Sequence, residues 1–416
     1  MFTFISKMKF DFKSNPILLI FIAVMILNFA LVIFAGVMTR GLFIRSIFFY
    51  PDDSFMDFFN SIQYGRDPYG KGVIYPPLMG LLYGIVGFFV MPFLNTGGVT
   101  ALRLTPVGAM SFFMITTVFL LIGFKLIEKK SDRSKLSFVY CAILLFSYPV
   151  LMVVERGNNI LYAAVFLGLF LSYYNSNEKW CRYLSYLFLG VSIGIKLFPA
   201  IFLLLVFKNR EKKELFFAIL ICTFLFIAPA ILLEGSIFSW FVNLSTFSGQ
   251  EAINVNYDLS GFLNYLSIMF HLNFDVVAVG FILRLIVVSI VALVILFIKN
   301  VQSWKLIGLL SLTLLLCGSV SRCYTFIYLL IPLTMFLFSN PKLSILNVWY
   351  ICLFLIFFVL LDGTASLVPY ANTFVWLTAD YPLRAFASIL LLFTLLGDCL
   401  YNQQHATYSE AETDEI

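Results

Sequence analysis

Charged residues are scarce in this sequence, which excludes a soluble globular domain. Only 12% of the 416 residues are Asp, Glu, Lys or Arg, whereas a soluble domain carries about 25%. Apolar residues make up 61%, and they recur in runs of about 20 residues, each long enough to cross a lipid core. Because lipid offers the backbone no hydrogen-bond partners, such spans are helices. The sequence therefore predicts an all-α integral membrane protein, with about 10 to 12 transmembrane helices in one domain over residues 1–408.

Residue types that usually bind metals or nucleotides are sparse as well. The two His, His271 and His405, stand alone, and the seven Cys form no Cys-X-X-Cys pair. We therefore expect no metal site built from these residues and interpret the Cys as small apolar core residues. The sequence has no ATP-binding loop, which argues against an ATP-driven pump. The net charge of +5 requires no nucleic-acid partner, because Lys and Arg gather in short loops as the positive-inside rule predicts.

Acidic residues outside the C-terminal tail are concentrated in one segment, residues 48–78. Its aspartates are Asp52, Asp53, Asp57 and Asp67. The segment follows the first apolar run, Pro16–Met38, which is too long for the apolar part of a signal peptide. Basic residues before that run place the N-terminus in the cytoplasm. We therefore expect the loop 39–105 to lie outside the cytoplasm and to carry interfacial helices.

Two later segments decide the topology. Residues 78–94 are apolar but short, and they can form a full span or an interfacial or re-entrant helix; the second choice keeps the next basic loop inside. Residues 183–207 are broken at Lys196–Pro199, where proline removes a backbone donor. One straight span would carry the basic residues of 208–213 outside, so we predict a hairpin with both ends in the cytoplasm. A second outer loop is expected at 234–273, and the acidic tail 409–416 is expected to be disordered.

Five short motifs follow one another along the chain. They are Asp57-Phe58-Phe59, Gly65-Arg66-Asp67-Pro68-Tyr69, Tyr75-Pro76-Pro77-Leu78, Arg156-Gly157-Asn158-Asn159 and the segment GVSIGIKLFP at 190–199. In this order the chain, over about residues 15–340, resembles the GT-C fold membrane glycosyltransferases that use polyprenyl-phosphate sugars, in particular the mannosyltransferase and arabinofuranosyltransferase group. The resemblance implies a GT-C-like helical bundle and a polyprenyl-phosphate-linked sugar donor, but it leaves the sugar and the acceptor open. Our own expectation is a glycan or glycolipid acceptor and a site on the periplasmic, extracytoplasmic face of a bacterial inner membrane.

Sugar transfer and the resemblance together point to Asp57 as the catalytic base. A carboxylate within hydrogen-bond reach can accept the proton of the acceptor hydroxyl, and Asp57 matches the early-loop acid of the family. Asp53 is the alternative, because it lies four residues earlier on the same face if this stretch is helical. Asp52 and Asp53 can instead cap a helix that begins near Ser54. Some relatives carry an Asp-X-Asp pair that this chain lacks, so Asp52 and Asp53 are the candidate ligands if a divalent cation is used.

Two cations within apolar segments are candidates for binding the donor phosphate. An ionisable residue inside a membrane is a functional candidate by default. Lys196 can receive the phosphate as a point charge, or its side chain can extend to the outer interface. Arg284 lies inside the apolar run 276–298, where it can bind phosphate or pair with an acid such as Asp258 or Asp275.

Further candidates lie at the expected outer ends of helices. Arg156 can bind phosphate or sugar, or it can pair with Glu155, and Arg322 is a similar candidate at a helix start. Tyr75 can bind substrate by stacking on a sugar ring, or it can belong to an interfacial aromatic belt. The same alternatives apply to Tyr64, Tyr69, Trp240 and Tyr257.

The function that we expect is transfer of a hexose, glucose or mannose, from a polyprenyl phosphate to a cell-envelope or surface polysaccharide such as the lipopolysaccharide O-antigen. A transporter or flippase for lipid-linked saccharides is the alternative, and it suits Lys196 and Arg284 equally well. It does not explain four aspartates in one outer loop, and the sequence shows no two-half repeat of the transporter kind. A polysaccharide polymerase is a third alternative.

Overall fold

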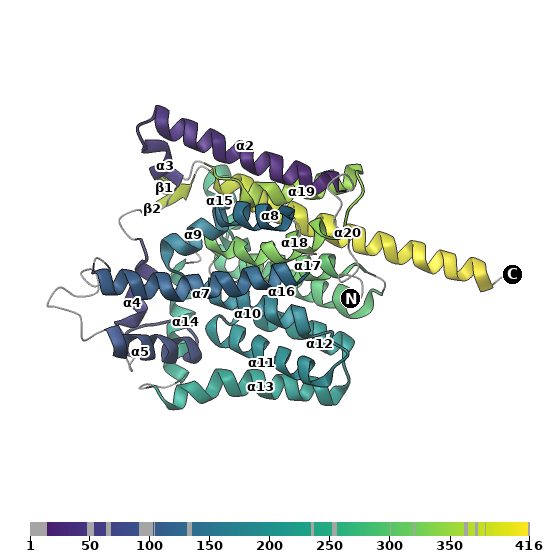
Figure 1. Ribbon diagram of the computed structural model, residues 1–416, viewed down its shortest axis with the longest axis horizontal. Coiled ribbons are helices and arrows are strands. Elements are labelled where there is room, and N and C mark those ends of the chain that lie inside the picture. Colours follow the sequence, from purple (N-terminus) through teal and green to yellow (C-terminus); the bar gives the residue numbers. More distant parts are fainter. Residues whose placement is uncertain are drawn as a thin grey trace.

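The computed structural model is a helical bundle, as the sequence predicted. It describes residues 15–47, 54–63, 68–90, 103, 105–130, 135–233, 237–251, 256–299, 301–318, 321–361, 365–370, 373–378 and 380–414. Long helices run roughly side by side, and the short outer elements α3, α4, α14, β1 and β2 gather at the left end of the view (Figure 1). The bundle therefore has two distinct ends, as a polytopic membrane domain requires.

Five of the described helices are long and apolar enough to cross a membrane, or six spans if one bent pair is counted. They are α2 (Pro16–Met38), α7 (Pro106–Lys130), α13 (Lys212–Ile231), α16 (Val276–Phe297) and α20 (Tyr381–Asp414). The sequence predicted about 10 to 12 transmembrane helices, and further apolar runs among the described residues form shorter or broken helices. These are α8 (Lys135–Leu145), α9 (Tyr148–Arg156), α10 (Ile160–Tyr173), α11 (Lys179–Ile195), α17 (Ser303–Cys317), the 3₁₀ helix η4 (Cys323–Leu329), α18 (Leu330–Leu337) and α19 (Ile345–Phe358).

Helix α17 forms the centre of the bundle. Every residue from Trp304 to Leu316 is buried, and a helix that is apolar all round is stable only when other helices surround it. Helices α2, α7 and α16, by contrast, leave many large apolar side chains exposed. In water such a surface would drive aggregation, so these helices face lipid.

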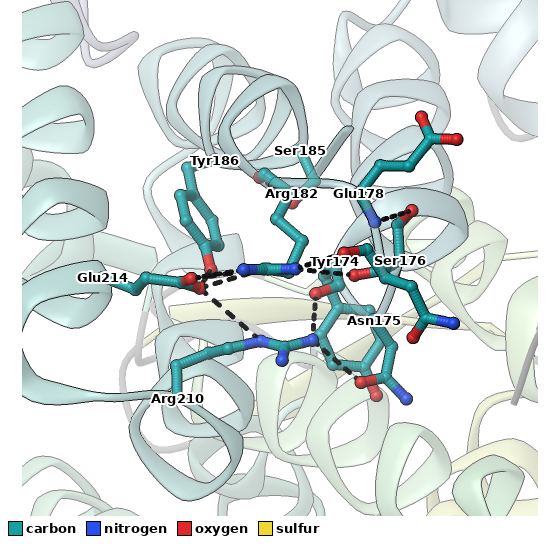
Figure 2. Close-up of polar contacts among 10 residues, drawn as sticks. Tyr174, Asn175, Ser176, Glu178, Arg182, Ser185, Tyr186, Arg210 and Glu214 are labelled. Atoms are coloured by element: carbon teal, nitrogen blue, oxygen red, sulfur yellow. Dashed lines mark hydrogen bonds and ion pairs between the residues drawn. The ribbon is translucent and has the colours of Figure 1, made fainter. Parts of the chain in front are cut away.

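The predicted hairpin in 183–207 is confirmed. Helix α11 leads to Lys196, and the chain returns through the 3₁₀ helix η3 (Phe198–Phe202) and α12 (Leu203–Asn209). At its two ends, Arg182 and Arg210 both reach Glu214, at 2.6 and 3.8 Å (Figure 2). Because both ends meet at one carboxylate, the segment enters and leaves on the same side. Lys196 lies at the far tip, about 21 Å along α11 from Arg182 at 1.5 Å per residue.

The two outer loops of the sequence form one layer of short helices. The first contributes α3 (Leu42–Ile47), α4 (Met56–Ile62) and α5 (Pro77–Val90), and the second contributes α14 (Ile237–Glu251) and α15 (Leu259–Phe270). Trp240 of α14 is buried and donates from Nε1 to the carbonyl of Ile74 at 2.9 Å. Helix α5 has 14 residues, about 21 Å, and is too short for a full span. It matches the interfacial or re-entrant helix that the sequence favoured.

Two features differ from the expectations. A two-stranded antiparallel hairpin, β1 (Ala365–Tyr370) and β2 (Thr373–Thr378), connects α19 to α20, with Ala365 opposite Thr378. The tail 409–416 was expected to be disordered, but α20 continues to Asp414 and projects beyond the bundle (Figure 1). Nucleation is the costly step in helix formation, and the packed part of α20 has already supplied it. Glu and Ala have high helix propensity, so the acidic tail can continue the helix.

Candidate active site

The Asp57 carboxylate is held by two side chains from the end of α9 and the turn after it. Arg156 donates from Nη2 to Oδ1 at 3.0 Å, and Asn158 donates from Nδ2 to Oδ2 at 2.7 Å. Asp57 lies in the first turn of α4, and the backbone N–H of Phe55 donates to the carbonyl of Glu155 at 2.5 Å. One backbone bond and two side-chain bonds therefore fix the outer loop on the end of α9.

The turn that carries Asn158 has little freedom to move. Gly157 ends α9 with φ +63°, and a Cβ atom there would lie 3.0 Å from Cβ of Phe58 and 3.2 Å from the Phe112 ring. Glycine is thus required both for the left-handed backbone and for the close approach of the outer loop. Asn158 is 3% exposed, and its Oδ1 accepts from the N–H of Ile160 at 3.0 Å. Both ends of the Asn158 amide are bonded, so the carboxylate it holds is fixed as well.

Tyr75 and Lys196 lie beside this carboxylate. The Lys196 ammonium sits 4.7 Å from the centre of the Tyr75 ring, and it also interacts electrostatically with Asp57. Burial, and secondly the Asp57 charge, raise the pKa of Tyr75 well above its usual value, so Tyr75 is a neutral hydroxyl. Lys196 at the hairpin tip and Tyr75 in the first outer loop, 121 positions apart, thus meet at one place.

The start of η4 completes the site. Tyr324 interacts electrostatically with Asp57, Arg322 and Arg156, so the structure brings these three predicted residues together. The neighbouring acids are Asp57 and Glu155, and the neighbouring cations are Arg156, Lys196 and Arg322. The described part of the site therefore carries one more positive than negative charge, which favours an anionic ligand.

Arg284 is in the paired arrangement that was its alternative interpretation. Its Nη2 is 3.3 Å from Oδ1 of Asp258, which is buried and also caps α15 by accepting from the N–H of Gly261 at 2.8 Å. Burial raises the pKa of Asp258 to about 6, although the Arg284 charge opposes the rise. The pair neutralises Arg284, and this geometry favours the ion pair over binding of the donor phosphate.

Asp52 and Asp53 fall outside the described residues, so their proposed roles as base, cap or cation ligand stay predictions. Among the residues that the structure does describe, no three His, Cys, Asp or Glu side chains come together as metal ligands.

The sequence analysis missed Asn158 as a site residue and two buried ion pairs on α20. Arg384 pairs with Asp380 at 3.2 Å, and Lys305 of α17 pairs with Asp398 at 2.7 Å. The charged residues at positions 380, 384 and 398 lie in or beside an apolar run, and such residues rarely face lipid. Their positions could therefore have predicted buried ion pairs. Asn158 had no comparable signal beyond its place in a motif.

An apolar cavity of about 170 Å³ lies between α7, α10 and the η4–α18 segment. Leu161 and Ile327 line its outer part, each three residues beyond a site residue, Asn158 and Tyr324. Ser172 and Thr334 line it farther along α10 and α18. The cavity thus begins one helical turn from the site and continues toward the opposite end of the bundle.

Comparison with known proteins gives one family. The model of glycosyltransferase family 87 matches residues 73–320, which include Tyr75, Arg156 and Lys196 and begin after Asp57. Neither the curated proteins nor the solved structures give a match. Because the matched region is more than half of the chain, the chain belongs to glycosyltransferase family 87, a family of GT-C-type membrane glycosyltransferases.

Proposed function

We propose that this glycosyltransferase moves a hexose from a polyprenyl-phosphate donor to a cell-envelope or surface glycan, with Asp57 as the base. The observation that carries the proposal is the convergence of a fixed carboxylate with an excess of cations at the outer end of the bundle. Asp57 is held at 3.0 Å by Arg156 and at 2.7 Å by Asn158. Side-chain exposures of 15% for Asp57 and 16% for Arg156 leave room for a substrate to reach the pair.

The reaction that fits this arrangement is a single displacement with inversion at the anomeric carbon. Asp57 accepts the proton of an acceptor hydroxyl while that oxygen attacks the anomeric carbon, and the bond from this carbon to the phosphate oxygen breaks. Carboxylate oxygens accept more than one hydrogen bond each, so the bonds from Arg156 and Asn158 leave Asp57 able to take the proton. The leaving polyprenyl phosphate gains negative charge, and nearby cations stabilise that charge in a site shielded from water.

The cations suited to the donor phosphate are Lys196 and Arg156, with Arg322 behind them. Lys196 is a point charge at the tip of a re-entrant segment, and Arg156 offers a planar fork of donors. Nη1 of Arg156 is buried and has no hydrogen-bond partner among the described residues. A buried donor without a partner is destabilising, and a donor phosphate oxygen would satisfy it.

The apolar cavity suits the isoprenoid chain of the donor. Its lining is almost entirely apolar, it begins within one turn of the site, and it follows α10 and α18 through the bundle. Burial of apolar chain contributes about 0.8 kcal/mol per CH₂ group, so even a few isoprene units would hold the lipid firmly. A phosphate at Lys196 and a chain in the cavity give the donor one orientation.

The basic residues indicate the side of the membrane on which the reaction takes place. Arg182, Lys208 and Arg210 gather at the ends of the hairpin, where positive residues mark the cytoplasmic side. The Asp57 site lies at the other end of α11. We infer a periplasmic site in a bacterial inner membrane, with the N-terminus in the cytoplasm.

A transporter or flippase would share the cations and the apolar cavity, and a polymerase would share the outer site. Membership of a glycosyltransferase family favours the enzyme over both alternatives.

The test compares purified protein supplied with polyprenyl-phosphate glucose, polyprenyl-phosphate mannose or a nucleotide sugar. Mass spectrometry of the envelope glycan from cells with and without the gene identifies the acceptor. We expect one added hexose per acceptor unit and activity with a polyprenyl-phosphate donor. Activity with the nucleotide sugar alone, or an unchanged glycan, contradicts the proposal.

A further inference from the structure

Arg384 is the most deeply buried charged residue among those described, and it does not touch the site. Its side chain is 0% exposed, it lies one turn into α20, and its Nη1 is 3.2 Å from Oδ2 of Asp380. Asp380 is also buried and accepts from the hydroxyl of Tyr257 at 3.2 and 3.3 Å. Burying two charges in a membrane protein is costly even when they pair, so the pair calls for a specific role.

The guanidinium of Arg384 connects two other parts of the bundle, the start of α9 and the end of α19. Its Cζ atom lies 3.5 Å from the centre of the Tyr148 ring, and Nη2 donates to the carbonyl of Val359 at 2.9 Å. Stacking of a planar guanidinium on an aromatic ring is specific to arginine. Tyr148 is itself 3% exposed and interacts electrostatically with Cys323 of η4. Arg384 thus fixes Tyr148 relative to α19 and α20.

Tyr148 is the first residue of α9, at a bend of 50° between α8 and α9. Arg156, the last residue of α9, lies eight positions further, about 12 Å at 1.5 Å per residue. A change of about 10° in the bend would therefore move Arg156 and Asn158 by about 2 Å. A bent helix has no continuous backbone ladder to set its direction, so the contacts at the bend must set it.

We propose that Arg384 is a positioning residue for the reaction. It sets the direction of α9 through the Tyr148 ring, and α9 presents Arg156 and Asn158 to Asp57. The inference rests on the proposed role of Asp57 for its effect on rate. Its structural part, the direction of α9, stands independently. Arg384 and Asp380 lie beyond the 73–320 region that matches the family.

The test replaces the pair without leaving a lone charge. The variant Asp380→Asn/Arg384→Met keeps an acceptor for the Tyr257 hydroxyl and fills the volume of the arginine with an apolar chain. Replacing a whole buried ion pair by residues of similar volume is often neutral for stability. Tyr148→Leu is the second variant, because it removes the stacking partner and leaves the ion pair in place.

A matched control exists about halfway along the same helix, four turns beyond Arg384. Asp398 pairs with Lys305 at 2.7 Å and accepts from the hydroxyl of Tyr350 at 2.7 Å. The variant Lys305→Met/Asp398→Asn removes an ion pair of the same kind and likewise keeps an acceptor for a tyrosine. It lies far from α9, so it measures the general effect of losing a buried pair.

Hydrogen exchange of α9 and steady-state kinetics with the polyprenyl-phosphate donor are measured on all three variants. In the Asp380→Asn/Arg384→Met and Tyr148→Leu variants we expect the amides of α9 to exchange roughly tenfold faster. We also expect kcat to fall by about 10- to 100-fold, with KM for the donor little changed. The control should keep wild-type α9 exchange and kcat. Unchanged exchange of α9 in both the Asp380→Asn/Arg384→Met and the Tyr148→Leu variants overturns the inference. An equal loss of kcat in the control variant overturns it as well. A third outcome is faster exchange of α9 with normal kcat, together with normal kcat in the Asp57→Asn variant. This outcome supports the role of Arg384 in the direction of α9 and contradicts the role proposed for Asp57.

Discussion

The carboxylate of Asp57 and the guanidinium of Arg156 lie 3.0 Å apart although 99 positions separate them in the chain. Asp57 comes from a short helix in the first outer loop, and Arg156 comes from the end of a bent transmembrane segment. The contact therefore fixes a loop on the membrane bundle. It also creates a partly exposed pair of opposite charges beside Lys196, an arrangement suited to moving a proton and holding a phosphate.

Asp57→Asn tests the base directly. The amide is the same size and can keep a hydrogen bond with Arg156, but it cannot take a proton at neutral pH. Loss of a general base typically costs about 100- to 10,000-fold in rate, and we expect kcat to fall in that range while the protein still inserts into the membrane. The assay is transfer of radiolabelled hexose from the polyprenyl-phosphate donor. Asp275→Asn, a helix cap of α16 away from the site, is the control. Wild-type turnover by the Asp57 variant would remove the base assignment.

Lys196→Met tests the hairpin tip as the phosphate site. Methionine keeps the length and the contact with the Tyr75 ring but removes the charge. A hydrogen bond to a charged group contributes about 1.5–3 kcal/mol, so kcat/KM for the donor should fall by about 10- to 100-fold. KM for the acceptor should change little. Lys208→Met, at the opposite end of the hairpin, should leave donor use unchanged. An equal loss for donor and acceptor would mean that Lys196 is structural.

Asn158→Ala tests whether the carboxylate must be held in place. Asp57 then keeps Arg156 but loses the 2.7 Å bond to Oδ2, and a lost bond of this kind costs about 1–3 kcal/mol. We expect kcat to fall by about 5- to 100-fold, with KM for the donor near its normal value. Asn28→Ala is a matched control, because Asn28 also bonds at both ends of its amide, to the backbone of Leu360. If both variants lose equal activity, Asn158 acts on stability rather than on Asp57.

Several residues that gather near Asp57 could be named from the sequence alone. Asp57, Arg156, Lys196, Tyr75 and Arg322 were all named from motifs and from charge in apolar surroundings, and the structure brings them together. The prediction of the hairpin was also correct, because a straight helix would have carried basic residues to the outer side. The lengths of the spans were less visible: five of the described helices are long and apolar enough to cross a membrane, or six with one bent pair, and a run of apolar residues does not reveal where a helix bends or shortens inside a bundle.

The parts that the sequence did not predict depend on contacts between distant segments. Nothing local shows that Arg284 pairs with Asp258 rather than with a phosphate, or that Asn158 faces the first outer loop. The β1–β2 hairpin and the helical tail were missed for a similar reason: neighbouring packed elements determine whether such segments become ordered. Charged residues within the last apolar run were visible, yet their partners, Tyr148 and Lys305, were not.

A double-mutant cycle at Arg182 and Glu214 tests what holds the two ends of the hairpin together. Arg182 donates three hydrogen bonds to the Glu214 carboxylate, the shortest at 2.6 Å, and two more to the carbonyls of Ser176 and Asn177 (Figure 2). A double-mutant cycle with Arg182→Met and Glu214→Gln should give a coupling free energy of about 1–3 kcal/mol for unfolding. The measurement is thermal unfolding in detergent. A coupling near zero would mean that α11 and α13 pack without help from this contact.

Gly123→Leu tests the cavity as the place of the isoprenoid chain. A Cβ atom at Gly123 meets the Val165 side chain at 3.7 Å, an ordinary contact, so the new side chain can project into the cavity without distorting α7. Displacing even two or three buried CH₂ groups costs about 2 kcal/mol, so KM for a long polyprenyl-phosphate donor should rise by roughly 10- to 30-fold. A donor with a single isoprene unit has too short a chain to reach Val165, which lies seven residues beyond Asn158, about 10 Å along α10, and its KM should be unchanged. Gly397→Leu, where an added Cβ meets nothing within 4 Å, is the control for adding bulk to the bundle. Because the two donors share the same phosphate and sugar, a rise for the long donor alone assigns the chain to the cavity, whereas equal changes for both would show that Gly123→Leu disturbs the site itself.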